Sequence, residues 1–439
     1  MTPKSGAQGK AEQAAPESVG FAPLAGIRVL DLSRVLAGPL CTQMLADLGA
    51  DIVKIEPCEG GDETRGWPPF VGGDGAIFLA VNRGKRSVAV DLKTEAGREI
   101  VLRLARDADV LVENFRTGVV QRLGIDYAAI KRVNPRVIYA SISGYGRSGP
   151  LATLPGYDAM AQAYCGVMSL TGEPDSPPVR SAPSPLDQTT GIVAAFGIVT
   201  ALHERDRTGQ GRLLEVSLYD TALTLLGYSA QTYWATGKMP QRSGSGHGSL
   251  CPYQAFEAAD GRVMIGVAND GLWRRFCAAA GLEGIRDDPR FHNNAARVTH
   301  FAETVGIVAA RVKTKTVAQW IEILNAASVP VAPINSLDQV LAHEQTAASG
   351  MLLSYEHPAY GSLQGMGLPI RFDGGARKAG APPPLLGEHT VEVLRSLGYD
   401  DTSIETWRKQ GVLRALPPDQ VNAAPGQSPA ARAALQAPR

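Results

Sequence analysis

Short apolar runs alternate with segments of helical pattern through the first half of the chain. Strands are predicted at 27–32 (IRVLDL), Asp51–Glu56 (DIVKIE), 87–92, 109–113 and 136–141, with a further strand at 212–218. Helices are predicted between most of these strands, from Pro39 onward in the first case, because proline is tolerated at a helix start. Strands that alternate with helices predict an α/β fold with a parallel, Rossmann-like sheet.

The pattern changes near residue 237, where a loop rich in glycine and serine precedes a new set of strands and helices. We interpret this part as a small α/β lobe inserted into a large lobe. The predicted boundaries are 21–220 for the first part of the large domain, 221–328 for a linker helix and the small domain, and 329–415 for the return. Residues 1–20 and 416–439 contain few large apolar side chains and are expected to be disordered.

Composition excludes several classes of protein. The chain has 439 residues, 44% of them apolar, and its 43 basic and 43 acidic residues cancel, so nothing favours nucleic acid or a membrane surface. Five scattered cysteines without a CxxC pair indicate a reducing compartment and argue against a structural zinc site. With neither a signal peptide nor a membrane span predicted, we expect a cytoplasmic protein, and the zero net charge is compatible with an oligomer.

The stretch 139–191 differs most from a packed core, because glycine and serine interrupt it and two carboxylates lie within it. Asp187 directly precedes a long apolar helix, and on sequence alone a helix N-cap is a more frequent role there than a nucleophile. The two roles are compatible, because the helix dipole is expected to keep the carboxylate ionised. Asp158 is either a second catalytic carboxylate or the start of an Asx turn.

Other side chains are candidates for binding. Arg65, Arg147 and Arg180 are candidates to hold a substrate carboxylate in a bidentate fork. Trp67 is predicted to be either core or a gate, and His247 lies in a loop that is either solvent-exposed or in contact with substrate. The cations of the NRGKRS segment (82–87) suit either a phosphate or a solvated edge.

Known catalytic patterns are weak in this sequence. Glu56 ends the second strand, where a nicotinamide enzyme places its ribose-binding acid, but the GxGxxG fingerprint is absent. No Ser/His/Asp signature, P-loop or metal-ligand spacing is found, so hydrolase, kinase and metalloenzyme functions are not favoured.

Several segments together resemble the class III CoA-transferases, and they occur in a consistent order from about residue 24 to 412. They are RVLAGP, DLGADIVKIE, GDETRGW, NRGKRSVAVDLK, VENFRTGVVQRLG, NPRVIYASISGYG, PLDQTTG and APPPLLGEHT. Within the family, HGSLCPYQAF and PPPLLGEHT are most similar to the members that act on succinyl-CoA and dicarboxylates. The resemblance implies an enzyme that moves CoA from an acyl-CoA to glutarate, itaconate, malate or a similar diacid, without a metal, and that forms a homodimer of interlocked rings.

The resemblance also implies roles for individual residues. Asp187 matches the catalytic aspartate, which forms an aspartyl-CoA thioester. The CoA molecule is expected to lie along Val35, Ala37, Val90, Lys93, Asn114, Phe115, Arg122, Leu123 and Tyr157. This chain departs from formyl-CoA transferase at two places. That enzyme has a lysine at the position of Pro155, so Arg147 becomes a candidate to replace the lysine. It also has a glycine-only loop where this chain has SGSGHGS, which includes Gly246 and His247.

Two other functions remain open at this level. The α-methylacyl-CoA racemases share the fold and pair an upstream histidine with the aspartate matched by Asp158. The first histidine of this chain is His203, so that pair cannot form in the same manner. A non-catalytic acyl-CoA-binding protein is the second alternative.

Overall fold

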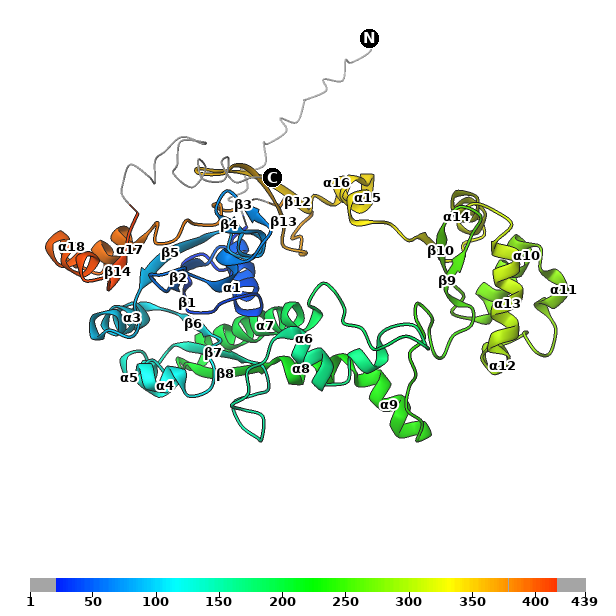
Figure 1. Cartoon of the computed structure of the whole chain (residues 1–439), viewed down its shortest axis with the longest axis horizontal. Helices are drawn as coiled ribbons and strands as arrows, with labels where there is room; N and C mark the ends of the chain where they lie inside the picture. Colours follow the sequence, from blue (N-terminus) through cyan, green and yellow to red (C-terminus); the bar gives the residue numbers. More distant parts are fainter. Residues whose placement is uncertain (1–20, 378, 417–439) are drawn as a thin grey trace, which may run out of the picture.

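The computed structural model describes residues 21–377 and 379–416 and consists of two lobes joined by two connections (Figure 1). The predicted disordered segments are 1–20 and 416–439, and all of their residues except Leu416 lie outside the described residues. The large lobe is built on a seven-stranded sheet in the order β14-β5-β2-β1-β6-β7-β8. Its strands are β1 (Arg28–Asp31), β2 (Asp51–Glu56), β5 (Lys85–Val90), β6 (Val110–Glu113), β7 (Ile138–Ser143), β8 (Arg212–Ser217) and β14 (Leu413–Arg414).

All neighbouring strands of this sheet run parallel except β14, which pairs antiparallel with β5. Leu30 of β1 lies opposite Val53 of β2 and Leu111 of β6. The predicted α/β class and the parallel sheet are therefore confirmed. The predicted 27–32 strand extends one residue beyond β1 at each end, and the predicted 87–92 strand is shifted by two residues from β5, which is the usual uncertainty at element ends.

Helices cover both faces of the sheet, because alternate residues of each strand point to opposite sides. Leu30 belongs to the core on one face, which includes residues of α3 (Glu95–Asp107), α4 (Val119–Leu123), α5 (Tyr127–Val133), α17 (Thr390–Ser396) and α18 (Asp401–Lys409). Val29 belongs to the core on the other face, which includes residues of α1 (Ala37–Asp47), α6 (Asp158–Tyr164), α7 (Pro185–Thr208) and α8 (Leu218–Leu225). The sheet is thus the middle of three layers.

α7 is the longest helix of the layer that contains α1. Its small residues allow it to pack closely on α1. An ideal Cβ on Gly191 would lie 2.5 Å from the carbonyl oxygen of Ala37, so only glycine fits at this crossing. α7 is long and apolar enough by composition to cross a membrane, yet Ala194, Ile198 and Leu202 are buried in the core of the large lobe. Its apolar character therefore has a structural use inside this lobe.

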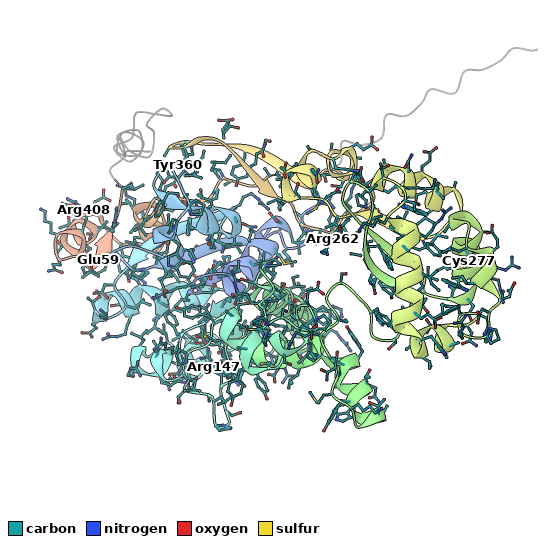
Figure 2. The ribbon with its side chains drawn as sticks, turned by 45° about the vertical axis from the view of Figure 1, so that its right-hand side comes forward. Glu59, Arg147, Arg262, Cys277, Tyr360 and Arg408 are labelled. Atoms are coloured by element: carbon teal, nitrogen blue, oxygen red, sulfur yellow. The ribbon has the colours of Figure 1, made fainter. Side chains whose placement is uncertain are left out.

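The second lobe has its own sheet and core. β9 (Tyr253–Glu257), β10 (Arg262–Gly266) and β11 (Val331–Pro333) form an antiparallel sheet in the order β11-β10-β9. Phe256, Val263, Trp273 and Trp320 belong to a core formed with helices α10 (Asp270–Ala280), α11 (Glu283–Arg286), α13 (Phe301–Val312) and α14 (Val317–Ala326). In α12 (Asn294–Thr299), the guanidinium of Arg297 lies over the ring of Trp273 at 4.9 Å. Figure 2 shows Cys277 in this lobe and Arg147 in the large lobe.

Smaller elements complete the chain. α9 (Gly227–Thr236) leads toward the second lobe, and α15 (Leu337–Ala342) and α16 (Glu344–Ser349) lead back. A hairpin follows, formed by β12 (Leu352–His357) and β13 (Gly361–Met366). Near the sheet lie β3 (Phe70–Val71), β4 (Asp74–Gly75), α2 (Ala76–Val81) and the 3-10 helix η1 (Glu63–Gly66), and a second 3-10 helix, η2 (Met168–Leu170), follows α6.

Candidate active site

A cavity of about 970 Å³ lies in the large lobe, at the carboxyl ends of the parallel strands. Its wall is made by the segments that follow β1, β2, β5, β6 and β7, together with the first turn of α7. The carboxyl ends of the strands are where open α/β sheets commonly bind ligands. The cavity is large enough for a cofactor-sized molecule.

The residues predicted to contact CoA all line this cavity. They are Val35, Ala37, Val90, Lys93, Asn114, Phe115, Arg122, Leu123 and Tyr157. They come from five different parts of the sequence, and the parallel sheet brings them together because the loops after its strands meet at one edge. Asp187, Arg147 and Pro155 line the same cavity. Their contacts with CoA stay a prediction.

The structure changes the interpretation of Asp187 as a helix cap. α7 begins with Pro185 in its first turn, and Asp187 is the third residue of the helix rather than its N-cap. The capping oxygen comes instead from Asp158, whose carboxylate accepts hydrogen bonds from the backbone N–H of Leu186 (2.8 Å) and of Asp187 (3.1 Å). The prediction of an N-cap was therefore wrong, and the Asp187 side chain is left free to face the cavity.

The protonation of Asp187 also differs from the expectation. Burial, and after it the nearby charge of Asp158, raise the pKa of the Asp187 carboxyl from its ordinary value to about 7. The dipole of α7 was expected to keep this group ionised, whereas removal from water is the largest influence on its pKa and acts in the opposite direction. A carboxylate with such a pKa is a poorly solvated and therefore reactive anion once it loses its proton.

Asp158 itself is buried and starts α6, and its side chain also contacts the amide of Gln162. Its carboxylate accepts from the backbone of α7, and within the described residues no hydrogen bond joins it to the backbone of its own turn, so the alternative of an Asx turn is wrong. The structure assigns this side chain the capping of a neighbouring helix.

The three arginines predicted to bind a substrate carboxylate have different surroundings. Arg65 is buried and uses its guanidinium on Glu56, Asp74 and the carbonyl of Pro384, which leaves it no spare donor. Arg147 lines the cavity, but it forms an ion pair with Glu113 at 2.8 Å and donates to the carbonyl of Phe115. Arg180 is exposed and does not line the cavity.

Trp67, Gly246 and His247 do not line the cavity either. Trp67 is half-buried and follows η1. His247 lies in the loop before β9, where its Nδ1 accepts from the backbone N–H of Ser249 at 3.1 Å. Within one chain this loop belongs to the connection to the second lobe (Figure 1).

The cations of the NRGKRS segment do not line the cavity, so they do not form a phosphate site there. Only Arg86 among them lies at a solvated edge. Arg83 is buried and pairs with Asp47 at 2.6 Å, and Lys85 is buried and pairs with Asp31 at 3.1 Å. Arg86 is on the surface beside Asp51. These pairs neutralise buried carboxylates inside the large lobe, and sequence reasoning missed them because their partners are distant in the chain.

Sequence reasoning also missed Arg34, which lines the cavity between the predicted contacts Val35 and Asn114. Its signal was its place in the loop directly after the first strand, within the RVLAGP segment. Glu63, Arg116 and Cys58 are further cavity residues that the sequence did not single out.

Comparison with known proteins identifies the class to which this fold and cavity belong. Residues 24–390 match the model of CoA-transferase family III. The chain belongs to this family, and it is an enzyme whose substrates include CoA thioesters.

Named relatives cover most of the chain. It is 39% identical to the succinyl-CoA:glutarate CoA-transferase of Mus musculus, over 89% of this chain and 90% of the relative. It is 40% identical to the succinate–glutarate CoA-transferase of Agrobacterium fabrum, over 85% of this chain and 96% of the relative. A crystal structure of a CaiB/BaiF family protein from Brucella suis superposes with a TM-score of 0.76 at 39% identity, and it covers 86% of this chain and 100% of the other.

Proposed function

We propose that this enzyme transfers CoA from succinyl-CoA or a similar acyl-CoA to a dicarboxylic acid such as glutarate, itaconate or malate. Asp187 is the proposed nucleophile. The observation that carries the proposal is that its carboxylate lies on the wall of the cavity and is not used to cap its own helix. The names of the Mus musculus and Agrobacterium fabrum relatives support the choice of substrates.

The proposed chemistry needs one carboxylate and no external energy source. The anion of Asp187 attacks the carbonyl of the donor thioester, and the C–S bond breaks to give a mixed anhydride and CoA thiolate. The thiolate then attacks the aspartyl carbonyl, so that the donor acid leaves as a carboxylate and an aspartyl-CoA thioester remains. The acceptor acid repeats both steps in reverse order, which returns Asp187 as a free carboxylate.

The protein must keep water from the anhydride and must stabilise each oxyanion. The two ends of the loop between β7 and α6 meet beside the cavity, where an ideal Cβ on Gly144 would lie 2.7 Å from the Cα of Gly156. Only glycine permits this approach of two backbones, which closes one side of the cavity with peptide groups. Backbone N–H groups in such loops are suitable oxyanion donors.

The first test replaces Asp187 by alanine or asparagine. We expect CoA exchange between labelled succinate and succinyl-CoA or glutaryl-CoA to fall by at least about 10³-fold, because the covalent route is lost. Binding of CoA, measured by calorimetry, should remain, which separates an enzyme from a non-catalytic binding protein. Mass spectrometry of wild-type enzyme quenched with hydroxylamine in the presence of succinyl-CoA should find the hydroxamate on Asp187. Undiminished exchange by either variant contradicts the proposal.

We also propose that the enzyme is a cytoplasmic homodimer. Large apolar side chains are exposed on α7, α8 and α9, among them Phe196, Tyr228 and Trp234. In a homodimer, the loop with Gly246 and His247 of one copy is proposed to lie over the cavity of the other copy, which accounts for its separation from the cavity within one chain.

A further inference from the structure

Arg34 is a cationic side chain of the cavity for which the described part of the chain provides no anionic partner. Its residue is half-buried, and its Nε atom is buried without a hydrogen-bond partner. Within residues 21–377 and 379–416, no carboxylate forms an ion pair with its guanidinium, which lies over the ring of Phe115 at 5.1 Å. A partly desolvated arginine without a counter-charge is costly to keep, which indicates that a ligand supplies the charge.

The backbone of Arg34 is held in place by side chains from other strands. Asn114, which follows β6, accepts from the Arg34 N–H at 2.9 Å and donates to the Arg34 carbonyl at 2.7 Å. The next residue, Val35, has a positive φ of 71°, which is unfavourable for a β-branched side chain, and its N–H is held by Asp62. Lys54 supports both Asp62, at 3.0 Å, and the carbonyl of Ser33, at 2.7 Å.

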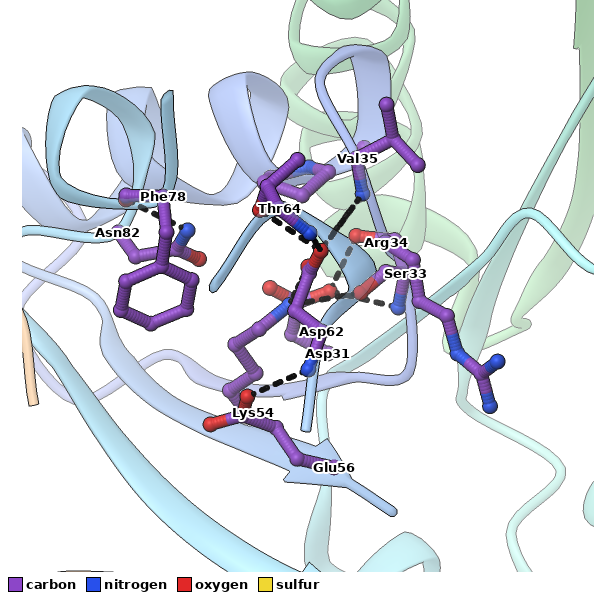
Figure 3. Close-up of polar contacts among 12 residues, drawn as sticks. Asp31, Ser33, Arg34, Val35, Lys54, Glu56, Asp62, Thr64, Phe78 and Asn82 are labelled. Atoms are coloured by element: carbon purple, nitrogen blue, oxygen red, sulfur yellow. Dashed lines mark hydrogen bonds and ion pairs between the residues drawn. The ribbon is translucent and has the colours of Figure 1, made fainter. Parts of the chain in front are cut away.

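Figure 3 shows this arrangement: Asp31, Lys54 and Asp62 lie together, and the guanidinium of Arg34 points away from them. The buried network therefore fixes the loop while leaving the arginine unused. A preorganised backbone of this kind is typical of groups that must meet a ligand in one geometry.

The position of Arg34 distinguishes it from the other cations of the cavity. Lys93 follows β5, two strands from β1 in the sheet, and Arg122 belongs to α4. The Arg34 loop instead continues into Ala37, whose carbonyl meets Gly191 of α7 one turn after Asp187. Of these loops, the one that carries Arg34 directly contacts the helix of the proposed nucleophile.

We propose that Arg34 binds the free carboxylate of the dicarboxylic acid, both on the acyl-CoA and on the incoming acceptor. This proposal rests on the proposed function. A diacid has two carboxylates, of which one reacts at Asp187 and the other remains charged in the cavity. The planar guanidinium can bind that second carboxylate through two parallel hydrogen bonds. Arg34 is then the residue that selects dicarboxylic over monocarboxylic substrates.

The test compares succinyl-CoA with butyryl-CoA, in which a methyl group replaces the free carboxylate. Affinities are measured by calorimetry in the Asp187→Ala background, so that no turnover occurs. With Arg34 present, succinyl-CoA should bind more tightly. Arg34→Gln should weaken succinyl-CoA about 10- to 100-fold and leave butyryl-CoA unchanged, as expected for the loss of a charged hydrogen bond. Arg34→Lys keeps the charge without the fork and should fall between the two.

Three further measurements make the result decisive. Arg116→Gln removes an exposed arginine of the same cavity and should leave the preference for succinyl-CoA intact. Titration with free CoA tests a phosphate ligand: if Arg34→Gln weakens CoA, butyryl-CoA and succinyl-CoA equally, Arg34 binds the cofactor and the proposal is overturned. Thermal melting verifies that the Arg34→Gln variant is folded. The proposal is also overturned if this folded variant changes none of these affinities. CoA exchange by the wild-type enzyme is assayed separately. A failure of the proposed function can therefore be distinguished from a failure of the proposal for Arg34.

Discussion

At the scale of single residues, the site depends on two carboxylates that are close in space and have opposite surroundings. Asp158 is buried and accepts hydrogen bonds from two backbone N–H groups of α7, so its carboxylate holds the start of that helix. Asp187 has no such donors, and burial together with the charge of Asp158 raises its pKa to about 7. The pair therefore divides two tasks, since one carboxylate holds the helix and the other is available to react.

This pKa predicts the pH dependence of the reaction. The proposed nucleophile is the anion, so kcat/KM for the donor acyl-CoA should rise with pH through a midpoint near 7 and level off above it. Between pH 8 and pH 6 we expect a fall of about tenfold. Stopped-time exchange assays with buffers of constant ionic strength provide the profile. An acidic limb with a midpoint near 4 contradicts the assignment of a desolvated Asp187 as the reacting group.

At the scale of elements, the start of α7 shows what the sequence could and could not provide. The helix itself, the position of Asp187 near its start and the apolar strands before it followed from local patterns. The cap did not, because Asp158 lies 29 positions earlier than Asp187 and meets it only in the fold. A local motif contains no information on a hydrogen bond between two elements.

The same reason explains the other differences between prediction and structure. The family resemblance was sufficient to predict many residues that line the cavity. The parallel sheet explains why they lie together, because the loops after its strands meet at one edge. The buried ion pairs of Arg83 and Lys85 could not, because their partners Asp47 and Asp31 belong to other elements. Arg34 was missed because its free guanidinium is recognised only when the partners of its neighbours are known.

The cap itself can be tested by two substitutions of Asp158. Asp158→Ala removes the acceptor of the Leu186 and Asp187 N–H groups and should lower the free energy of unfolding by about 1–3 kcal/mol. Asp158→Asn keeps an acceptor oxygen and should cost less. Chemical denaturation measures both values.

The two variants also separate the cap from the charge. Asp158→Asn removes the repulsion that contributes to the raised pKa of Asp187, so its pH profile should move to lower pH. The pKa of Asp187 should fall only part of the way to its ordinary value, because burial is the larger cause of the raised pKa. Unchanged stability in Asp158→Ala shows that the hydrogen bonds to α7 do not support the helix.

At the scale of the whole molecule, several large apolar side chains of the described chain are exposed to solvent. Phe196 of α7 is 73% exposed, Tyr228 and Trp234 of α9 are 75% and 72% exposed, and Leu337 of α15 is 72% exposed. These residues lie on the elements between and beside the two lobes, whose cores are separate (Figure 1). Exposed apolar surfaces of this kind typically mark a contact with another subunit.

The proposed homodimer predicts a solution mass of twice the 46.4 kDa chain, measured by light scattering after size-exclusion chromatography. Phe196→Asp places a charge in the exposed apolar face of α7 and should shift the mass toward the monomer, because an unpaired charge at the centre of an interface is costly. Lys409→Asp, on the exposed surface of α18, is the matched control and should stay dimeric. If the loop of one copy completes the cavity of the other, loss of the dimer should also reduce exchange activity. A wild-type enzyme that is monomeric and fully active at low micromolar concentration contradicts this arrangement. If instead the Phe196→Asp variant is monomeric and keeps full activity, the dimer has only a structural role.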